Sequence, residues 1–302
     1  MGSIFNVQQV INGLQLGSIY ALIALGYTMV YGIVRLINFA HGDFFMIGAY
    51  ASYGAFYLFN SFIGAGNPLA FIALIIAMVA GGAVASLANQ LAYKPLRYKP
   101  KLSSLVTAIG VSMFLEFFFS AFPFIGPSPR GFPELLPKVM FTIGGAQVSN
   151  YVILDVAVAA LLMIGLTFLI QKTPLGRAMR AVSQDKDAAK LMGIDVEQII
   201  TWTFLIGGAF AGAAGLLAGL TYPRIQPYMG ILPGLKAFIA AVLGGIGNVP
   251  GAMLGAYIMG LAETFSTAFN SLLGEGIAFV ILILVLLVRP TGILGEKTAD
   301  KI

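Results

Sequence analysis

Long apolar runs recur along the whole chain, and each is close to the length that crosses a lipid bilayer. Only 10% of the residues are charged, whereas a soluble domain carries about 25%. The runs are also too long and too uniform for transmembrane β-strands, which alternate apolar and polar residues in short segments. The sequence therefore predicts an all-α fold, a polytopic transmembrane helical bundle that forms one domain over residues 1–302.

Nine runs are expected to be helical, and two of them are expected to be irregular. The nine cover residues 10–33, 43–60, 68–93, 102–124, 150–170, 199–221, 233–249, 250–271 and 276–289. The run at 102–124 begins with small polar residues, which suits a broken or re-entrant helix. The run at 233–249 is short and leads into the Gly- and Pro-rich stretch 244–251, which cannot be a straight helix. We therefore expect about eight full spans with one or two broken or re-entrant helices.

The basic residues gather in three segments, which sets the expected orientation. Lys and Arg cluster at 94–101, at 172–190 and from 289 to the C-terminus, and the last group comprises Arg289, Lys297 and Lys301. Because Lys and Arg are enriched in cytoplasmic loops, these segments and the turn containing Arg35 are assigned to the cytoplasm, and the N-terminus to the outside. The Pro- and Gly-rich segment 125–149 is the largest external segment and is suited to covering the outer mouth.

Residues 171–198 form a charged cytoplasmic loop inside this apolar chain. Thr173 followed by Pro174 is typical of a helix start, Gly193 of a helix end, and Asp195 with Gln198 of a capping box. Two short helices are therefore expected. They should expose apolar residues beside charged ones, namely Ala188, Ala189, Leu191, Met192 and Ile194 beside Arg180, Asp185, Lys186 and Asp187. Such an amphipathic helix is suited to a groove on another protein.

The spacing of Asp187, Ala188, Ala189 and Gly193 matches the EAA–G loop by which permeases of ATP-binding-cassette importers hold their ATPase subunits, with Asp in place of Glu. We therefore interpret the loop as an ATPase-coupling segment that includes Arg180, Asp185 and Ile194. The alternative is a solvated loop that is capped for stability alone.

No catalytic or metal-binding constellation is visible in the sequence. His41 is the only histidine, and the chain has no cysteine. It also has no GxxxxGK[ST] motif, so it cannot cradle nucleotide phosphates with a P-loop. We expect no metal and no cofactor, and a transport subunit rather than an enzyme. Any ATP hydrolysis must come from partner subunits.

Polar residues within the apolar runs are functional candidates, because burying them in lipid is costly. Four of them are candidates for a translocation path or for buried polar pairs: Glu116, Lys236, Asn248 and Glu263. The alternative is that they make purely structural polar contacts between helices. A second group, Arg35, Asn38, His41 and Asp43, is interpreted as a cytoplasmic polar corner with a structural or coupling role.

Glycine and short repeats give two further expectations. Gly208 with Gly212, and other pairs four residues apart, predict close helix packing. The tetrapeptides at 47–50 and 254–257 read Ile-Gly-Ala-Tyr and Leu-Gly-Ala-Tyr. This short internal similarity is weak evidence for two duplicated halves.

Five segments resemble the LivH-type permeases of bacterial branched-chain amino acid importers. They are residues 38–43 (Asn-Phe-Ala-His-Gly-Asp), 187–194, 236–238, 241–252 and 289–295. The long block at 241–252 and the ending at 289–295 are the most specific, and the resemblance extends over nearly the whole chain.

The resemblance implies a multi-pass protein of the bacterial inner membrane that imports leucine, isoleucine and valine. Its implied partners are a second, LivM-like permease, two cytoplasmic ATPases and an extracytoplasmic substrate-binding protein. Related permeases carry urea or short amides, which is one alternative substrate class. An ion-coupled secondary amino acid transporter, with Glu116 or Glu263 at a coupling site, is an alternative of another class.

Overall fold

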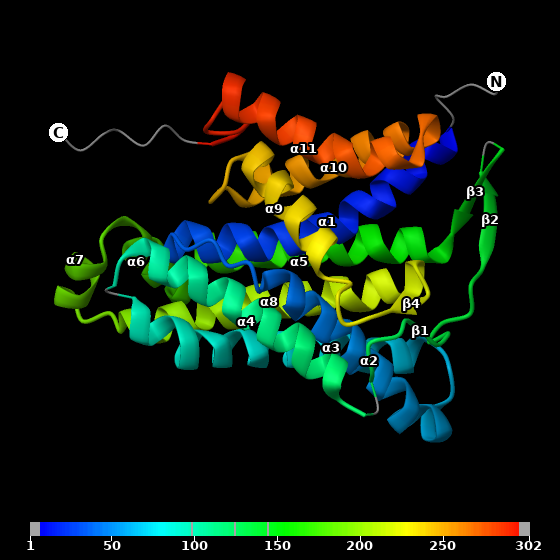
Figure 1. The fold of residues 1–302 in the computed structure, drawn as a ribbon, viewed down its shortest axis with the longest axis horizontal. Helices are drawn as coiled ribbons and strands as arrows, with labels where there is room; N and C mark the ends of the chain where they lie inside the picture. Colours follow the sequence, from blue (N-terminus) through cyan, green and yellow to red (C-terminus); the bar gives the residue numbers. More distant parts are fainter. Residues whose placement is uncertain (1–6, 98, 124, 144, 296–302) are drawn as a thin grey trace.

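The computed structural model describes residues 7–97, 99–123, 125–143 and 145–295, which form one helical bundle (Figure 1). Lys297 and Lys301 lie outside the described residues. The long helices are α1 (Val7–Val34), α2 (His41–Ile63), α3 (Asn67–Ala88), α4 (Lys101–Ala121), α5 (Asn150–Lys172), α8 (Val196–Thr221), α9 (Ile231–Gly244), α10 (Val249–Phe269) and α11 (Ser271–Val288). Two short helices, α6 (Pro174–Gln184) and α7 (Lys186–Leu191), follow α5, and a π-turn, η1 (Asn89–Tyr93), and a 3₁₀ turn, η2 (Lys94–Leu96), follow α3.

The predicted helical bundle is confirmed, and each of the nine predicted runs is a helix. Six helices among the described residues are long and apolar enough to cross a membrane. Within the run at 102–124, residues 102–121 form one continuous helix, α4, so the expected break at its start is absent. The short run at 233–249 does break, because α9 ends at Gly244 and α10 begins at Val249.

The fold also contains short strands that an all-α prediction leaves out. Strands β2 (Met140–Ile143) and β3 (Ala146–Ser149) form an antiparallel hairpin, and β1 (Arg130–Gly131) pairs with β4 (Arg224–Ile225). Figure 1 shows these strands at one end of the bundle and α6 and α7 at the other. The predicted external segment 125–149 and the predicted cytoplasmic loop therefore lie at opposite ends.

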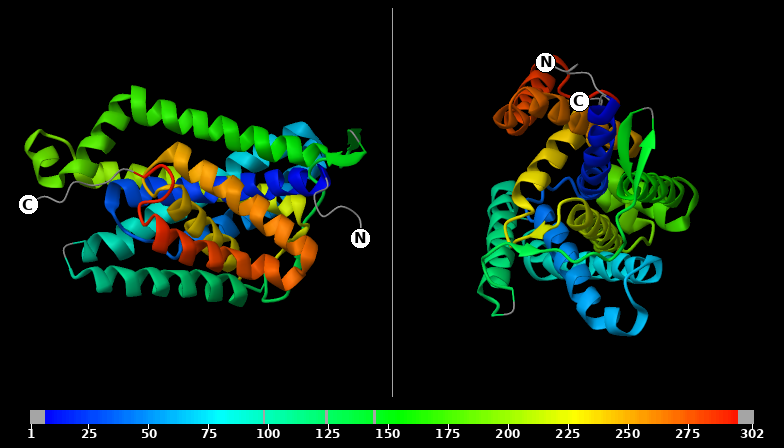
Figure 2. Two further views of the ribbon diagram at one scale, coloured as in Figure 1. Left: turned by 90° about the horizontal axis from the view of Figure 1, so that it is seen from above. Right: turned by 90° about the vertical axis from the view of Figure 1, so that its right-hand side faces the viewer.

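Helices α1 and α8 form the centre of the bundle. Within the apolar window of each, 83% of the residues are buried, against 11% for α11. They run antiparallel, since Gln15 near the start of α1 bonds to Thr221 at the end of α8. Figure 2 shows α4 and α5 on opposite sides of the bundle. The outer helices expose their apolar side chains, as a surface in contact with lipid requires.

The packing has an internal repeat that pairs α1–α2–α3 with α8–α9–α10. Helix α1 packs along α10 as α8 packs along α3, and α1 contacts α9 as α8 contacts α2. Because α1 and α8 are antiparallel, the two units are inverted relative to one another, as in many transporters. The similar tetrapeptides at 47–50 and 254–257 do not correspond in this repeat, since they lie on α2 and α10, and the repeat pairs α2 with α9 and α3 with α10.

Glycines allow the helices of the two units to approach closely. A Cβ atom on Gly208 or Gly212 of α8 would collide with the backbone of α3, and one on Gly13 or Gly17 of α1 would collide with α10. These contacts confirm the small-residue pairs predicted from the sequence. In lipid, helix association depends on such close backbone contact, because apolar burial gives no driving force there.

We expect Gly212→Ala to weaken the contact between α8 and α3. The added methyl group would meet the carbonyl of Ala77, and overpacking of this kind costs about 1–3 kcal/mol. Gly165→Ala in α5 is the matched control, because nothing lies within 4 Å of a Cβ there. Thermal unfolding of the detergent-solubilised proteins should show a lower midpoint for Gly212→Ala than for the unaltered protein, and no lower midpoint for Gly165→Ala. Equal midpoints for the two variants would contradict this account.

Candidate functional site

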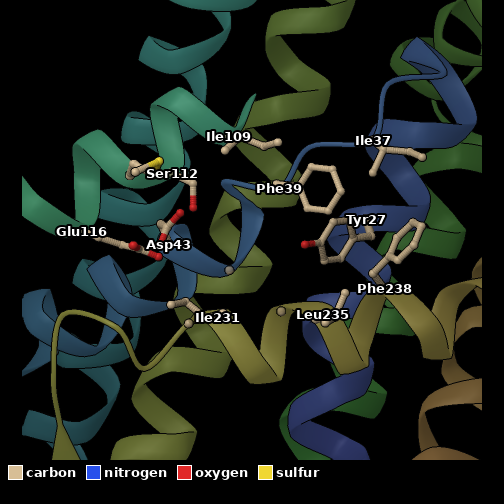
Figure 3. Close-up of a pocket in the computed structure, with 14 residues that line it drawn as sticks. Tyr27, Ile37, Phe39, Asp43, Ile109, Ser112, Glu116, Ile231, Leu235 and Phe238 are labelled. Atoms are coloured by element: carbon tan, nitrogen blue, oxygen red, sulfur yellow. The ribbon is translucent and has the colours of Figure 1, made fainter. Parts of the chain in front are cut away.

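A cavity of about 260 Å³ lies where the N-termini of α2 and α9 meet inside the bundle. Figure 1 shows that both helices begin part-way along the bundle and not at its ends. The cavity is lined by side chains from α1, the 35–40 linker, α2, α4 and α9, drawn in Figure 3. They are Tyr27, Ile37, Phe39, Gly42, Asp43, Ile109, Ser112, Met113, Glu116, Gly230, Ile231, Gly234, Leu235 and Phe238.

The linker between α1 and α2 turns the chain back into the bundle. Arg35 has a φ of 59°, in the left-handed region that a non-glycine residue seldom adopts. The buried Asn38 then accepts a hydrogen bond from the backbone N–H of Ala40 (3.1 Å) and one from the hydroxyl of Tyr93 (2.7 Å). These bonds fix the turn, so α2 starts inside the protein.

Glycine brings the two helix starts together. A Cβ atom on Gly42 of α2 would collide with the carbonyl of Gly230, and one on Gly234 would collide with Gly42. Neither helix has a side-chain cap at its N-terminus. The N–H groups of the first turn of a helix have no intrahelical partners, and the helix dipole makes that end positive. Two partly positive helix ends therefore face the same small space.

Acidic and hydroxyl side chains gather at one end of the cavity. Figure 3 shows Ser112 and Glu116 of α4 pointing toward Asp43 of α2, and both interact with its carboxylate. Asp43 is 2% exposed, and its Oδ2 atom has no hydrogen-bond partner among the described residues. No lysine, arginine or histidine is among the described residues that line the cavity.

The rest of the cavity wall is apolar. It is formed by Phe39 and Ile37 of the linker, Ile109 and Met113 of α4, and Ile231, Leu235 and Phe238 of α9. The ring of Tyr27 packs edge-on against Phe238, with 5.7 Å between the ring centroids. The cavity is thus amphipathic, with carboxylates at one end and hydrocarbon at the other.

The structure places the residues of the predicted cytoplasmic polar corner in different surroundings. Arg35 is exposed at the end of α1, whereas Asn38, His41 and Asp43 are at most 2% exposed. His41 packs against Tyr27 with 4.5 Å between the ring centroids, and Asp43 lines the cavity. The reason is that the chain re-enters the bundle after Arg35, a turn that the sequence pattern did not reveal.

Glu116 joins Asp43 in the cavity, whereas Lys236 and Glu263 form a separate buried pair. Lys236 Nζ lies 2.6 Å from Glu263 Oε1, and the hydroxyl of Tyr20 donates to Glu263 Oε2 at 2.8 Å. This pair ties α9 to α10 and α1. Lys236 is therefore paired with Glu263 and does not line the cavity.

Asn248 has a capping position in the structure. Its Oδ1 accepts from the N–H of Gly251 at the start of α10, and its Nδ2 donates to the carbonyl of Leu294. The N–H groups of Ile293 and Leu294 bond back to the last turn of α9. The two motifs at 241–252 and 289–295 therefore pack on one another.

The two helices predicted in the 171–198 loop are present with the predicted caps. Thr173 accepts from the N–H of Gly176 and Asp195 from the N–H of Gln198, as predicted. Asp185 also caps α7, which was not predicted, by accepting from the N–H groups of Asp187 and Ala188. Gly193, with a φ of 81°, ends the α7 segment.

The exposed apolar surface of this loop is smaller than predicted. Leu191 and Met192 are 88% and 81% exposed and Ala188 is exposed, but Ile194 is half-buried. The prediction that Ala189 is exposed is wrong, because it faces the bundle and is buried. Arg180, Asp185 and Asp187 are near this surface, and Arg180 bonds to the carbonyl of Ile170 at the end of α5.

A contact joins this loop to the start of the linker. Lys186 of α7 donates from Nζ to the carbonyl of Val34 at the end of α1, at 3.3 Å. Burial, with Arg97 and Arg35 nearby, lowers the pKa of Lys186, and Glu197 opposes that shift. Glu197 itself forms an ion pair with Arg97. The α7 segment is therefore anchored directly beside the turn that positions α2.

The sequence did not point to Ser112, Tyr27 or the apolar wall of the cavity. Apolar residues and a single serine in transmembrane runs carry no local signal of a site. Only the meeting of α2, α4 and α9 makes them neighbours.

Comparison with known proteins identifies close relatives over the full length. The family model described as "Branched-chain amino acid transport system / permease component" matches residues 9–286. The chain is 44% identical to the high-affinity branched-chain amino acid transport system permease protein BraD of Pseudomonas aeruginosa, covering 98% of each chain. It is 42% identical to the permease protein LivH of Escherichia coli K12, covering 99% of this chain and 98% of that one.

Two more distant similarities were also found. The chain is 28% identical to the permease protein LivM of Escherichia coli K12, covering 91% of this chain and 68% of that one. Among solved structures, PsaBC from Streptococcus pneumoniae in complex with Fab matches with a TM-score of 0.48 and 12% identity, covering 93% of this chain and 91% of that one.

We expect Lys236→Met to destabilise the protein strongly, because it leaves the Glu263 carboxylate buried without its cation. Removing one partner of a buried pair costs about 3–5 kcal/mol. Adding Glu263→Gln to the same chain should restore most of that loss, and Lys172→Met at the exposed end of α5 is the control. Unfolding in detergent measures all three; additive losses in the double variant would show that the two side chains are not coupled.

Proposed function

This chain belongs to the family of branched-chain amino acid transport permeases, and from that premise we propose that it is the LivH-type subunit of an ATP-binding-cassette importer for leucine, isoleucine and valine. The observation that carries the proposal is the 44% identity to BraD over 98% of both chains. The relatives are permease components, so this multi-pass membrane protein is a transport subunit and not an enzyme.

The cavity supports an aliphatic amino acid as the substrate. Its volume of about 260 Å³ is below the range of about 300–1,000 Å³ that drug-sized ligands occupy, so it suits a small solute. Its walls are mainly hydrocarbon, with a few polar groups at one end. An apolar wall distinguishes one methylene group by only about 1–3 kcal/mol, so strict selection among leucine, isoleucine and valine falls to the substrate-binding protein.

The proposed complex contains a second permease, two ATPases and an extracytoplasmic substrate-binding protein. The 28% identity to LivM supports a homologous second permease, since two related chains can pack around a pseudo-symmetric path. The exposed apolar faces of α4 and α11 offer surface for that contact as well as for lipid.

We propose nine crossings of the membrane, with the N-terminus outside and the C-terminus inside. Seven crossings are complete helices, and two, those of α2 and α9, are part extended chain and part helix. Irregular backbone at membrane depth is tolerated where it is buried in protein or lines a cavity, and both segments meet that condition. The basic residues around α6 and α7 place that end in the cytoplasm.

We propose that α7 docks on an ATPase. Its support is the exposed pair Leu191 and Met192, held at the tip of a capped and anchored helix. Movement of α7 on ATP binding would then act on the bundle as a rigid element, which suits a switch between outward and inward states.

Transport by the reconstituted complex tests the proposed function. In proteoliposomes with the second permease and the ATPases, radiolabelled leucine should accumulate only when ATP and the binding protein are both present. Leucine uptake that follows a proton gradient without ATP would favour a secondary transporter. Urea uptake without leucine uptake would assign the chain to the urea-type branch.

Replacing Leu191 and Met192 together by Ser should reduce ATP hydrolysis stimulated by the binding protein by about tenfold or more, because exposed apolar anchors carry much of the energy of an interface. Phe62→Ser is the matched control, since Phe62 is 86% exposed in the last turn of α2, far from α7 in the chain. Co-purification with the ATPase should fall in parallel for the double variant alone. Normal hydrolysis and co-purification would remove α7 from the docking surface.

A further inference from the structure

We propose that the cavity at the N-termini of α2 and α9 binds the amino acid in transit, with its ammonium group on Asp43 and Glu116 and its aliphatic side chain against α4 and α9. This inference rests on the proposed function, and it adds the chemical basis of recognition within the permease itself. It concerns the described residues shown in Figure 3.

The first step of the argument is charge. Asp43 and Glu116 face one another in a space that no described cationic side chain lines. The nearest buried lysine on α9, Lys236, is held by Glu263 at 2.6 Å. Two facing carboxylates repel one another unless a cation lies between them or one of them holds a proton. The described lining of the cavity therefore supplies no cationic partner for these two carboxylates.

The second step is an unsatisfied acceptor. Buried polar atoms in proteins almost always have a hydrogen-bond partner, and each exception requires an explanation. Asp43 is 2% exposed, yet its Oδ2 has no partner among the described residues. A primary ammonium group carries three N–H donors, enough to satisfy this oxygen together with Glu116 and the hydroxyl of Ser112.

The third step is the opposite end of the ligand. The first turns of α2 and α9 begin beside the same cavity, close to Gly42 and Gly230, and neither has a side-chain cap, so the positive ends of two helix dipoles face it. Discontinuous helices that end at membrane depth commonly present their N-termini to the carboxylate of a substrate. An α-amino acid carries its ammonium and carboxylate on one carbon, so it can satisfy both features at once.

The fourth step is the side chain. Beyond the carboxylates the wall consists of Phe39, Ile109, Met113, Leu235 and Phe238. A polar or charged side chain would lose its hydration there without replacement, which disfavours it. A branched aliphatic group fits this surface. The cavity is thus polar at one end and apolar at the other, as leucine is charged at its Cα end and aliphatic beyond it.

Competition against radiolabelled leucine, measured on the purified permease and ATPase complex without the binding protein, tests this inference. 3-Methylbutylamine keeps the ammonium group and 4-methylpentanoate keeps only the carboxylate. We expect the amine to compete at least tenfold more strongly than the acid. Equal competition by the two, or stronger competition by the acid, would overturn the assignment of the ammonium group and leave Asp43 and Glu116 to share a proton.

Variants give an independent measurement. Asp43→Asn and Glu116→Gln should each weaken leucine binding by about tenfold or more, since a hydrogen bond to a charged group is worth about 1.5–3 kcal/mol. Asp155→Asn is the matched control: Asp155 is also fully buried, but it bonds to Gln15 and Thr221 away from the cavity. Intact assembly with the ATPase shows that each variant is folded. If Asp43→Asn fails to assemble, the binding by Glu116→Gln and the competition assay determine whether the ammonium group binds these carboxylates.

The outcomes also separate this inference from the proposed function. Leucine import by the unaltered complex, with unchanged binding in Asp43→Asn and Glu116→Gln, would reject the ammonium site and leave the permease function in place. Failure of the unaltered complex to import leucine would reject the function itself.

Discussion

The meeting of α2 and α9 inside the bundle is the constraint on which the cavity depends. Gly42, Gly230 and Gly234 approach so closely that a single Cβ atom would separate the two helix starts. Everything that makes the cavity polar follows from this contact: the two uncapped helix ends, the position of Asp43 in the first turn of α2, and its proximity to Glu116 of α4. The glycines of the central α8 allow the same close approach to α2 and α3.

Contiguous contacts connect this cavity to the α6–α7 end. Lys186 of α7 donates a hydrogen bond to the carbonyl of Val34 at the end of α1, and the chain turns at Arg35. Asn38 then accepts a hydrogen bond from Tyr93, shortly before α2 begins at His41. The linker from Val34 to Asp43 joins the anchor of α7 to the carboxylate proposed for the substrate. If both proposed sites are correct, a shift of α7 would act on this linker directly, and their coupling would need no long chain of side chains.

Much of the fold could be predicted from the sequence, because membrane helices and caps have local signals. Apolar runs gave nine helices close to their observed bounds, and Thr173 and Gly193 marked the start of α6 and the end of α7. The cavity could not be predicted, since it depends on contacts between residues far apart in the chain. That Asp43 lines the cavity could not be predicted, because a re-entrant linker looks, in sequence, like any polar turn. Ala189 was misjudged because which face of a one-turn helix is buried depends on the bundle behind it.

The central position of α1 and α8 has a consequence for how the protein is made. Their mean hydropathies are 1.6 and 1.8, whereas the peripheral α5 and α11 reach 2.6 and 2.7. Helix α1, which has the lowest of these values, is thus one of the two helices most enclosed by others, whereas the peripheral α4 has the same hydropathy as α8, 1.8. Gly13 of α1 contacts Leu261 of α10, which follows it by more than two hundred residues in the chain. Helix α1 therefore leaves the translocon long before α10 can cover its small-residue face, and a nascent chain stopped before α10 exposes that face to chaperones and proteases.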